Sequence, residues 1–233
     1  MARTKIGYVP GMLSTPPDET AVQSTVFGHL PIIFDARVLR PRPWTVAQSR
    51  WAAELLGTIP GRHRVLELCA GAGHIGLLAV ALADARSADG HLLVSVDVNP
   101  AATEFVRRNA QAAGLGARVD ARVGSLSEVL APDERFDLVI ADPPWVPSGL
   151  VARHPDDPVS AIDGGPDGLE LVRSCLDVVS EHLADGGAAV LQVGPDQTPA
   201  VASYVEADPA LRLRVVEERV VEEGGLMHLA RVT

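Results

Sequence analysis

The sequence predicts an α/β fold in which a parallel sheet is covered by helices on both faces and closed by a C-terminal antiparallel hairpin. Between residues 64 and 206, short apolar runs typical of buried strands alternate with segments whose apolar residues recur at helical spacing. Because parallel strands need crossover connections, this alternation implies helices on both faces of the sheet. Near the C-terminus, two strand patterns flank the turn at residues 222–225, Glu-Glu-Gly-Gly, which predicts the hairpin.

The expected elements begin with strand-like residues 31–34 and with residues 46–56, which have helical spacing and Thr45 as their N-cap. The expected strands of the main sheet are residues 64–69, 91–97, 118–124, 136–142 and 188–193. The expected helices are residues 75–85, 100–113, 168–183 and 199–206. The closing hairpin is expected over residues 211–221 and 227–232.

The length and composition fit one large domain with a small extension. The chain has 233 residues, of which 47% are hydrophobic, enough for one sizeable core. We expect an N-terminal extension with a strand-like hairpin over residues 1–45 and a cofactor-binding domain over residues 46–233.

No apolar run reaches the roughly 18 residues that span a bilayer, and no signal-peptide core follows the N-terminus. The two cysteines form no disulfide framework, and neither they nor the histidines have metal-ligand spacing. We therefore expect a cytoplasmic protein without a membrane or metal partner.

The charge distribution leaves the kind of macromolecular partner open. A net charge of −10 counts against a protein that grips nucleic acid through a general basic surface. The segment 35–64 is nevertheless rich in arginine, at positions 37, 40, 42, 50, 62 and 64. This segment is either a solvated face or a contact for phosphate or another acidic group.

The first chemical motif is at residues 65–76, Val-Leu-Glu-Leu-Cys-Ala-Gly-Ala-Gly-His-Ile-Gly. It predicts a strand that runs into a glycine turn and opens a helix, which is where nucleotide-like cofactors bind. Glu67 lies four residues before Gly71, where it would repel a pyrophosphate but suit the methionine end of S-adenosylmethionine (SAM); a helix-capping role is the alternative. Asp97 ends the next strand and can accept both ribose hydroxyls, as in dinucleotide sites. His74, within the turn, either touches the ligand or is a solvated loop residue, and the second interpretation is preferred.

The second motif is a buried strand that ends in Asp142, Pro143, Pro144 and Trp145. Prolines lack an N–H group, so they end the strand and leave carbonyl oxygens free as acceptors. An ionised Asp142 and the Pro143 carbonyl could each accept one N–H of an amine or amide, which would orient its nitrogen. Trp145 could stack on a planar substrate. The motif indicates methyl transfer to nitrogen, driven by positioning.

The two motifs in this order resemble class I SAM-dependent methyltransferases, which have a Rossmann-like, seven-stranded sheet with a closing hairpin. This resemblance implies that Gly71 and Gly73 shape the methionine pocket, that Asp97 binds ribose and that Val98 packs on adenine. Ser125 and Leu126 lie where the family contacts the adenine amine, usually through an acidic residue. The cofactor-binding residues implied in this way are Glu67, Gly71, Gly73, Asp97, Val98, Ser125 and Leu126.

Within this class, residues 26–200 resemble the HemK/PrmC glutamine methyltransferases. The second motif is similar to the (Asn/Asp/Ser)-Pro-Pro-(aromatic) element of amino-methyltransferases, which implies catalytic roles for Asp142, Pro143, Pro144 and Trp145. The segments that favour HemK/PrmC are residues 39–45, Leu-Arg-Pro-Arg-Pro-Trp-Thr, residues 161–169, Ala-Ile-Asp-Gly-Gly-Pro-Asp-Gly-Leu, and residues 191–194 with Gln197.

Three departures bear on the methyl acceptor. The family motif is Asn-Pro-Pro-Tyr, whereas this chain has Asp142, Pro143, Pro144 and Trp145. An asparagine side chain both donates and accepts hydrogen bonds, so it matches a glutamine amide at two points. An ionised Asp142 can only accept. Only about 40 residues precede the Arg-Pro-Arg-Pro segment, too few for the helical domain by which release-factor methylases bind their partner. Ser125 replaces the usual acidic residue.

The sequence therefore predicts a SAM-dependent N-methyltransferase of HemK-like type, acting on a planar amide or amine nitrogen of a protein glutamine or a small molecule. Methylation of an RNA or DNA exocyclic amine is the alternative. A dinucleotide-binding oxidoreductase and a SAM-binding protein without catalysis also stay open. Residues 146–160 are expected to form a lid that selects the substrate.

Overall fold

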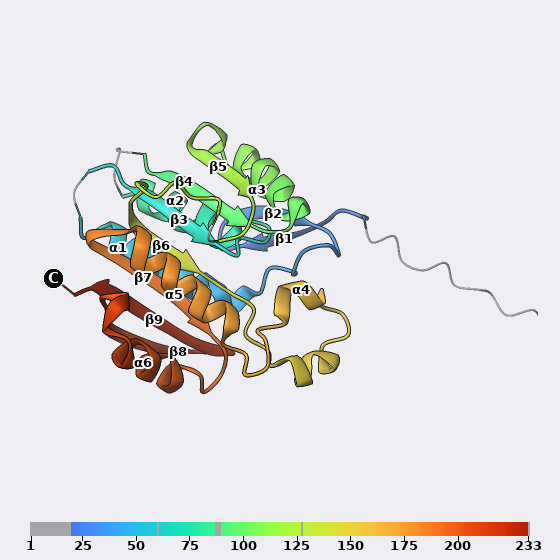
Figure 1. Cartoon of the computed structure of the whole chain (residues 1–233). Helices are drawn as coiled ribbons and strands as arrows, with labels where there is room; N and C mark the ends of the chain where they lie inside the picture. The colour runs from blue at the N-terminus through green and yellow to red at the C-terminus, as the bar shows by residue number, and fades with distance from the viewer. Residues whose placement is uncertain (1–19, 60, 87–89, 127, 233) are drawn as a thin grey trace, which may run out of the picture.

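The computed structural model describes residues 20–59, 61–86, 90–126 and 128–232, and in these it confirms the predicted seven-stranded sheet (Figure 1). The strand order is β5-β4-β3-β6-β7-β9-β8, in which β9 pairs antiparallel with both β7 and β8 and the other pairs are parallel. The strands are β3 Arg64–Leu68, β4 Leu92–Asp97, β5 Val119–Val123, β6 Phe136–Ala141, β7 Leu183–Val193, β8 Leu213–Val221 and β9 Gly224–Arg231. The helices are α1 Val46–Leu56, α2 His74–Asp84, α3 Pro100–Ala112, α4 Val159–Ile162, α5 Glu170–His182 and α6 Thr198–Ala207.

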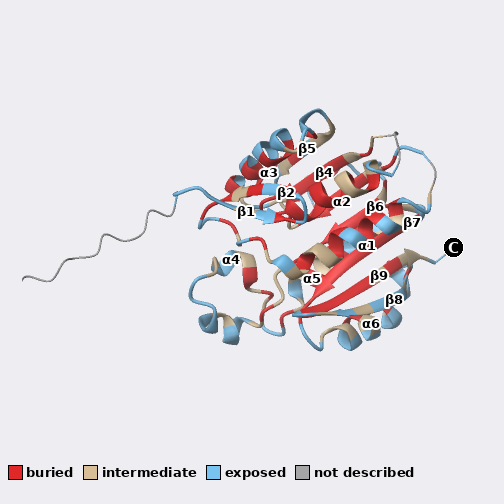
Figure 2. Ribbon diagram, turned by 180° about the vertical axis from the view of Figure 1, so that it is seen from behind, coloured by how far each residue is buried: buried red, intermediate tan, exposed pale blue. Residues whose placement is uncertain are grey.

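Helices cover both faces of the sheet because alternate strand residues point to opposite sides. Val65 of β3 packs in one hydrophobic cluster with α1, α2 and α3, whereas its neighbour Leu66 packs in a second cluster with α5 and α6. Figure 2 shows the buried strands between the helices; α3, α5 and α6 have exposed outer faces, whereas α2 is buried or half-buried along its length. None of the helices in the described ranges is long and apolar enough to cross a membrane.

A two-stranded hairpin, β1 Gln23–Phe27 and β2 Leu30–Phe34, precedes the main sheet, as predicted for the N-terminal extension. Its Phe27 and Ile32 side chains are buried in the cluster around α2. Asn109 of α3 accepts a hydrogen bond from Ile33 N at 2.9 Å and donates to Ile33 O at 3.0 Å. The same amide donates to Ala72 O, in the glycine turn, at 2.9 Å. One side chain therefore joins the hairpin to the turn. The domain boundary after residue 45 stays a prediction, and residues 1–19 lie outside the described residues.

The elements differ from the sequence-based prediction in several of their bounds and in one predicted cap. The strand β3 ends at Leu68, because Cys69 adopts a left-handed backbone with φ +56°. The strand β7 begins at Leu183 and not at residue 188, since the chain enters the sheet directly after α5. Thr45 precedes α1 but does not cap it; its hydroxyl donates to Arg42 O, within the 3-10 turn Pro43–Thr45.

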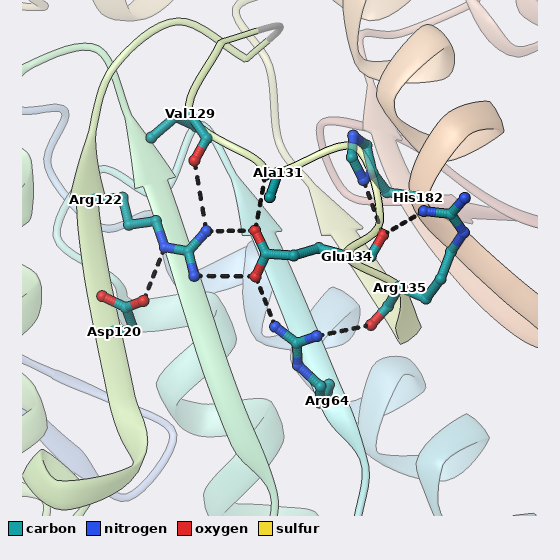
Figure 3. Close-up of polar contacts among 8 residues, drawn as sticks. All are labelled: Arg64, Asp120, Arg122, Val129, Ala131, Glu134, Arg135 and His182. Carbon is teal, nitrogen blue, oxygen red and sulfur yellow. Dashed lines mark hydrogen bonds and ion pairs between the residues drawn. The ribbon is translucent and has the colours of Figure 1, made fainter.

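A polar network holds the connection between β5 and β6 at the amino ends of β3 and β6 (Figure 3). Glu134 accepts hydrogen bonds from Arg122 at 2.7 and 3.1 Å and from Arg64 at 2.7 Å. These guanidinium groups lower the pKa of Glu134 to about 2. The network lies at the end of β3 and β6 opposite to Gly71 and Asp142, so its part is to fix the strands that carry the two motifs.

Candidate functional site

The two sequence motifs meet at one edge of the sheet. The glycine turn follows β3, Asp97 ends β4 and Asp142 follows β6, and the carboxyl ends of neighbouring parallel strands share an edge. A cavity of about 770 Å³ opens there. The residues predicted from the sequence that line it are Gly71, Asp97, Val98, Ser125, Leu126, Asp142 and Pro144.

The glycine turn is shaped by backbone that side chains other than glycine rarely adopt. Gly73 has φ +76°, and a Cβ atom on it would lie 2.9 Å from Cγ2 of Val106. Gly71 has φ +51° and donates its N–H to Oδ2 of Asp97 at 2.8 Å, while Oδ1 of Asp97 accepts from Asn99 N at 2.8 Å. Each Asp97 oxygen retains a second lone pair, so the carboxylate can still accept hydroxyl groups from a ligand.

Glu67 is brought to the turn but does not line the cavity. It is 2% exposed, and it accepts hydrogen bonds from Gly76 N and from the Ser95 hydroxyl, each at 2.7 Å. Its Oε1 thereby satisfies a free N–H in the first turn of α2. Burial is the largest of the causes that raise the pKa of Glu67 to about 7, and the nearby carboxyl groups of Asp97 and Asp142 contribute to the same increase. The structure shows Glu67 as internal support of the turn; contact with a cofactor stays a prediction.

The charged residues that line the large cavity all have the same sign. The charged side chains of the described residues that line it are acidic: Asp97, Asp142, Asp163, Asp177, Glu181 and Asp208, with no arginine or lysine. Burial also raises the pKa of Asp97. Such walls repel a pyrophosphate and attract a cation. The residues around the cavity include no cluster of His, Cys, Asp and Glu that could hold a metal ion, as far as the described chain extends.

The second motif separates this cavity from a smaller one of about 220 Å³, lined by Asp142, Pro143, Pro144 and Trp145 among others. Burial raises the pKa of Asp142 to about 7. The prediction that Asp142 is ionised therefore holds only in part near neutral pH. All four residues of the motif line this one small cavity, which brings a carboxyl residue and an aromatic residue to the same chamber.

Gln197 and Gly194 fix the position of Trp145. The Gln197 amide donates to Trp145 O at 3.1 Å and to Gly168 O at 3.4 Å, and its oxygen accepts from Gly194 N at 2.7 Å. A Cβ atom at Gly194 would lie 2.5 Å from Cε3 of Trp145. The segments 161–169 and 191–197, which the sequence analysis took only as a family resemblance, therefore hold the tryptophan in place.

The prediction that His74 is a solvated loop residue is wrong. His74 is the first residue of α2, is 8% exposed and lies edge-on to Phe27, with ring centroids 4.7 Å apart. It lines both cavities, and burial lowers its pKa to about 3. The signal for its burial was α2 itself, because a helix that is apolar on every side is enclosed from its first turn.

The arginine-rich segment is partly committed to internal ion pairs. Arg42 donates to both carboxylate oxygens of Asp157 at 2.6 Å, which ties the segment before α1 to the loop at residues 146–160. Arg37 binds Asp35, and Arg64 binds Glu134. Three of the six arginines are thus held by acidic residues of this chain, and Arg42 and Asp157 also line the smaller cavity.

Comparison with known proteins finds a family model and relatives that match this chain in part. A model of the methyltransferase small domain matches residues 51–153. A ribosomal protein uL3 glutamine methyltransferase of Bradyrhizobium diazoefficiens is 34% identical over 176 residues, covering 71% of this chain and 53% of that protein. A release factor glutamine methyltransferase of Gloeobacter violaceus is 34% identical over 176 residues, covering 73% and 59%. The chain thus spans somewhat more than half the length of these relatives.

Similarity in structure extends over more of the chain. The crystal structure of a SAM-dependent methyltransferase from Agrobacterium tumefaciens has a TM-score of 0.61 at 13% identity, covering 91% of this chain and 70% of that one. At this identity the likeness shows that the two chains share a fold.

Proposed function

This chain carries the methyltransferase small domain and is related to the HemK-like glutamine methyltransferases, and on that basis we propose that it is a SAM-dependent N-methyltransferase of HemK-like type. The acceptor that fits best is a planar amide nitrogen, on a protein glutamine or a small molecule. The observation that carries the proposal is the junction of two cavities at Asp142, one large and acidic and the other small and flanked by Trp145.

The residues of the large cavity fit SAM better than a dinucleotide. When bound, SAM supplies an electrophilic methyl group on a sulfonium cation. The acidic wall favours its two cationic groups, whereas a dinucleotide would bring a pyrophosphate to a cavity whose described lining holds no arginine or lysine. Asp97 would hold the ribose, and the exposed side chain of Val98 would pack on adenine. This chemistry counts against the oxidoreductase alternative.

The small cavity supplies what a nitrogen acceptor needs. The Asp142 carboxylate and a proline carbonyl can accept its N–H groups and so orient its lone pair. A nitrogen that gains a methyl group must also give up a proton. Because burial raises the pKa of Asp142 to about 7, its carboxylate can take that proton near neutral pH.

The test is transfer of radiolabelled methyl from SAM into cell lysate, followed by separate protease and nuclease digestion. Label released by protease supports the glutamine acceptor. Label released by nuclease supports the exocyclic-amine alternative. Asp142→Ala serves as the control, with turnover expected to fall about 100-fold or more and SAM affinity nearly intact, since an orienting group is lost from the acceptor side. An Asp142→Ala protein of near-normal turnover would remove Asp142 from the mechanism.

A further inference from the structure

The two cavities share a wall that contains one donor and one acceptor. Five residues line both cavities: Leu39, His74, Asp142, Pro144 and Ala161. Of these five, only His74 and Asp142 carry a polar side chain. A group that sits between the two cavities is therefore bordered by a histidine residue and an aspartate residue.

The imidazole of His74 is neutral at physiological pH. Its burial disfavours the imidazolium and lowers the pKa to about 3, and its place at the N-terminus of α2 adds to this, since that end of a helix repels positive charge. A neutral ring has one N–H donor and one lone pair. It also places no positive charge beside the site proposed for a sulfonium.

The surroundings of the ring decide which nitrogen carries the proton. Nδ1 is buried and has no hydrogen-bond partner in the described structure. A proton there would be an unsatisfied buried donor, which is costly. The favourable tautomer has its proton on Nε2, the nitrogen left to meet a ligand in the cavities that His74 lines.

We propose that Nε2–H of His74 donates a hydrogen bond to the carbonyl oxygen of a primary carboxamide whose N–H group is accepted by Asp142. His74 is then a positioning residue that sets acceptor specificity. The inference rests on the proposed function and names its substrate class. An ionised aspartate alone cannot distinguish an amide from an amine, because both present N–H groups. A donor and an acceptor together match the two ends of a carboxamide, so His74 supplies the hydrogen bond that an asparagine at position 142 would have made.

A matched pair of variants tests the donor. His74→Gln keeps an N–H near the position of Nε2, and His74→Met has a similar length without a donor. The probe is the blocked peptide acetyl-Ala-Gln-Ala-amide, titrated by calorimetry into the protein saturated with S-adenosylhomocysteine. His74→Met is expected to weaken peptide binding about ten-fold and to raise the KM for the peptide by a similar factor, because a hydrogen bond in a buried site is lost. His74→Gln is expected to stay within about three-fold of the wild type on the same scale.

Two controls separate this role from a structural one. Both variants are expected to keep the wild-type affinity for S-adenosylhomocysteine and the wild-type Tm, and His29→Met, at an exposed position between β1 and β2, is expected to change nothing. Equal peptide affinity of His74→Met and His74→Gln would overturn the assignment, as would an equal loss of cofactor affinity in both.

The outcomes also separate this inference from the proposed function. Methylation of the peptide by the wild type, with the two variants indistinguishable, overturns only the role of His74. No methylation of the peptide, with methylation of an adenine-containing oligonucleotide instead, overturns the carboxamide acceptor and the role of His74 together. That second result leaves SAM-dependent transfer standing.

Discussion

The buried carboxyl group of Glu67 makes stability depend on pH in a way that one substitution should remove. Burial raises its pKa from 4.5 to about 7, so the folded protein holds this proton more tightly than the unfolded chain does. The resulting stabilisation is complete below the unfolded pKa and is lost as pH rises through 7. Glutamine at this position can still accept from Gly76 N and interact with the Ser95 hydroxyl, but it does not titrate.

The size of the effect follows from the shift. A difference of about 2.5 pKa units, at 1.36 kcal/mol each, corresponds to roughly 3 kcal/mol. Asp97 and Asp142 act on Glu67 and titrate in both proteins, so the informative quantity is the difference between wild type and Glu67→Gln. We expect the free energy of unfolding of wild type to fall by roughly 3 kcal/mol relative to the variant between pH 5 and 8.

Urea unfolding followed by circular dichroism at pH 5, 6, 7 and 8 measures this difference directly. Glu104→Gln, which changes an exposed glutamate on α3, is the matched control and should leave the pH dependence of wild type unchanged. A difference between wild type and Glu67→Gln that is constant across this range would refute the reasoning, because Glu67 would then be equally ionised in both states.

Three further predictions concern the site itself. Asp97→Ala should weaken SAM binding by about 1–3 kcal/mol through lost charge-assisted hydrogen bonds, and unchanged calorimetric affinity would sink the ribose assignment. Because burial raises the pKa of Asp142 to about 7, the ionised fraction that can accept a proton increases as pH rises. The methyl-transfer rate should therefore increase through pH 7. A rate that falls instead would identify the protonated form as active. Gly194→Ala places a Cβ atom 2.5 Å from the Trp145 ring and should raise the KM for the acceptor without changing cofactor affinity. The control Gly57→Ala, whose Cβ meets ordinary contacts at 3.4 Å, should leave this KM unchanged. Equal KM values for the two variants would contradict the proposed place of Trp145.

The fold was predictable because its signals are local. Apolar runs at β3 and β6, helical spacing at α3 and the glycine turn each depend on neighbours in the sequence, and parallel pairing then brings Gly71 and Asp142 to one edge. The departures in the elements arose from local backbone geometry that the residue types do not specify. Cys69 ends its strand early through a backbone conformation that no residue pattern announces.

The sequence pointed to residues that line the two cavities, but their roles stay predictions and their protonation could not be predicted. Asp142 and Asp97 line the cavity as expected, yet the pKa of Asp142 depends on burial, which only the packed structure shows. His74 was misassigned because its turn looked open to solvent. The apolar α2 was a local signal of burial, but the contact with Phe27, 47 residues earlier in the chain, could not be predicted from it. The tie between Arg42 and Asp157 spans 115 positions and has no sequence signal.

The amide of Asn109 makes the N-terminal hairpin part of the same cooperative unit as the cofactor turn. Its three hydrogen bonds reach both Ile33 of β2 and Ala72 of the turn. When either segment opens, the hydrogen bonds between that segment and Asn109 break and are replaced by hydrogen bonds to water. Ligand that stabilises the turn should thus also raise the opening free energy of the hairpin. Slower amide hydrogen exchange at Ile33 would then report cofactor occupancy from an element that does not touch the cofactor.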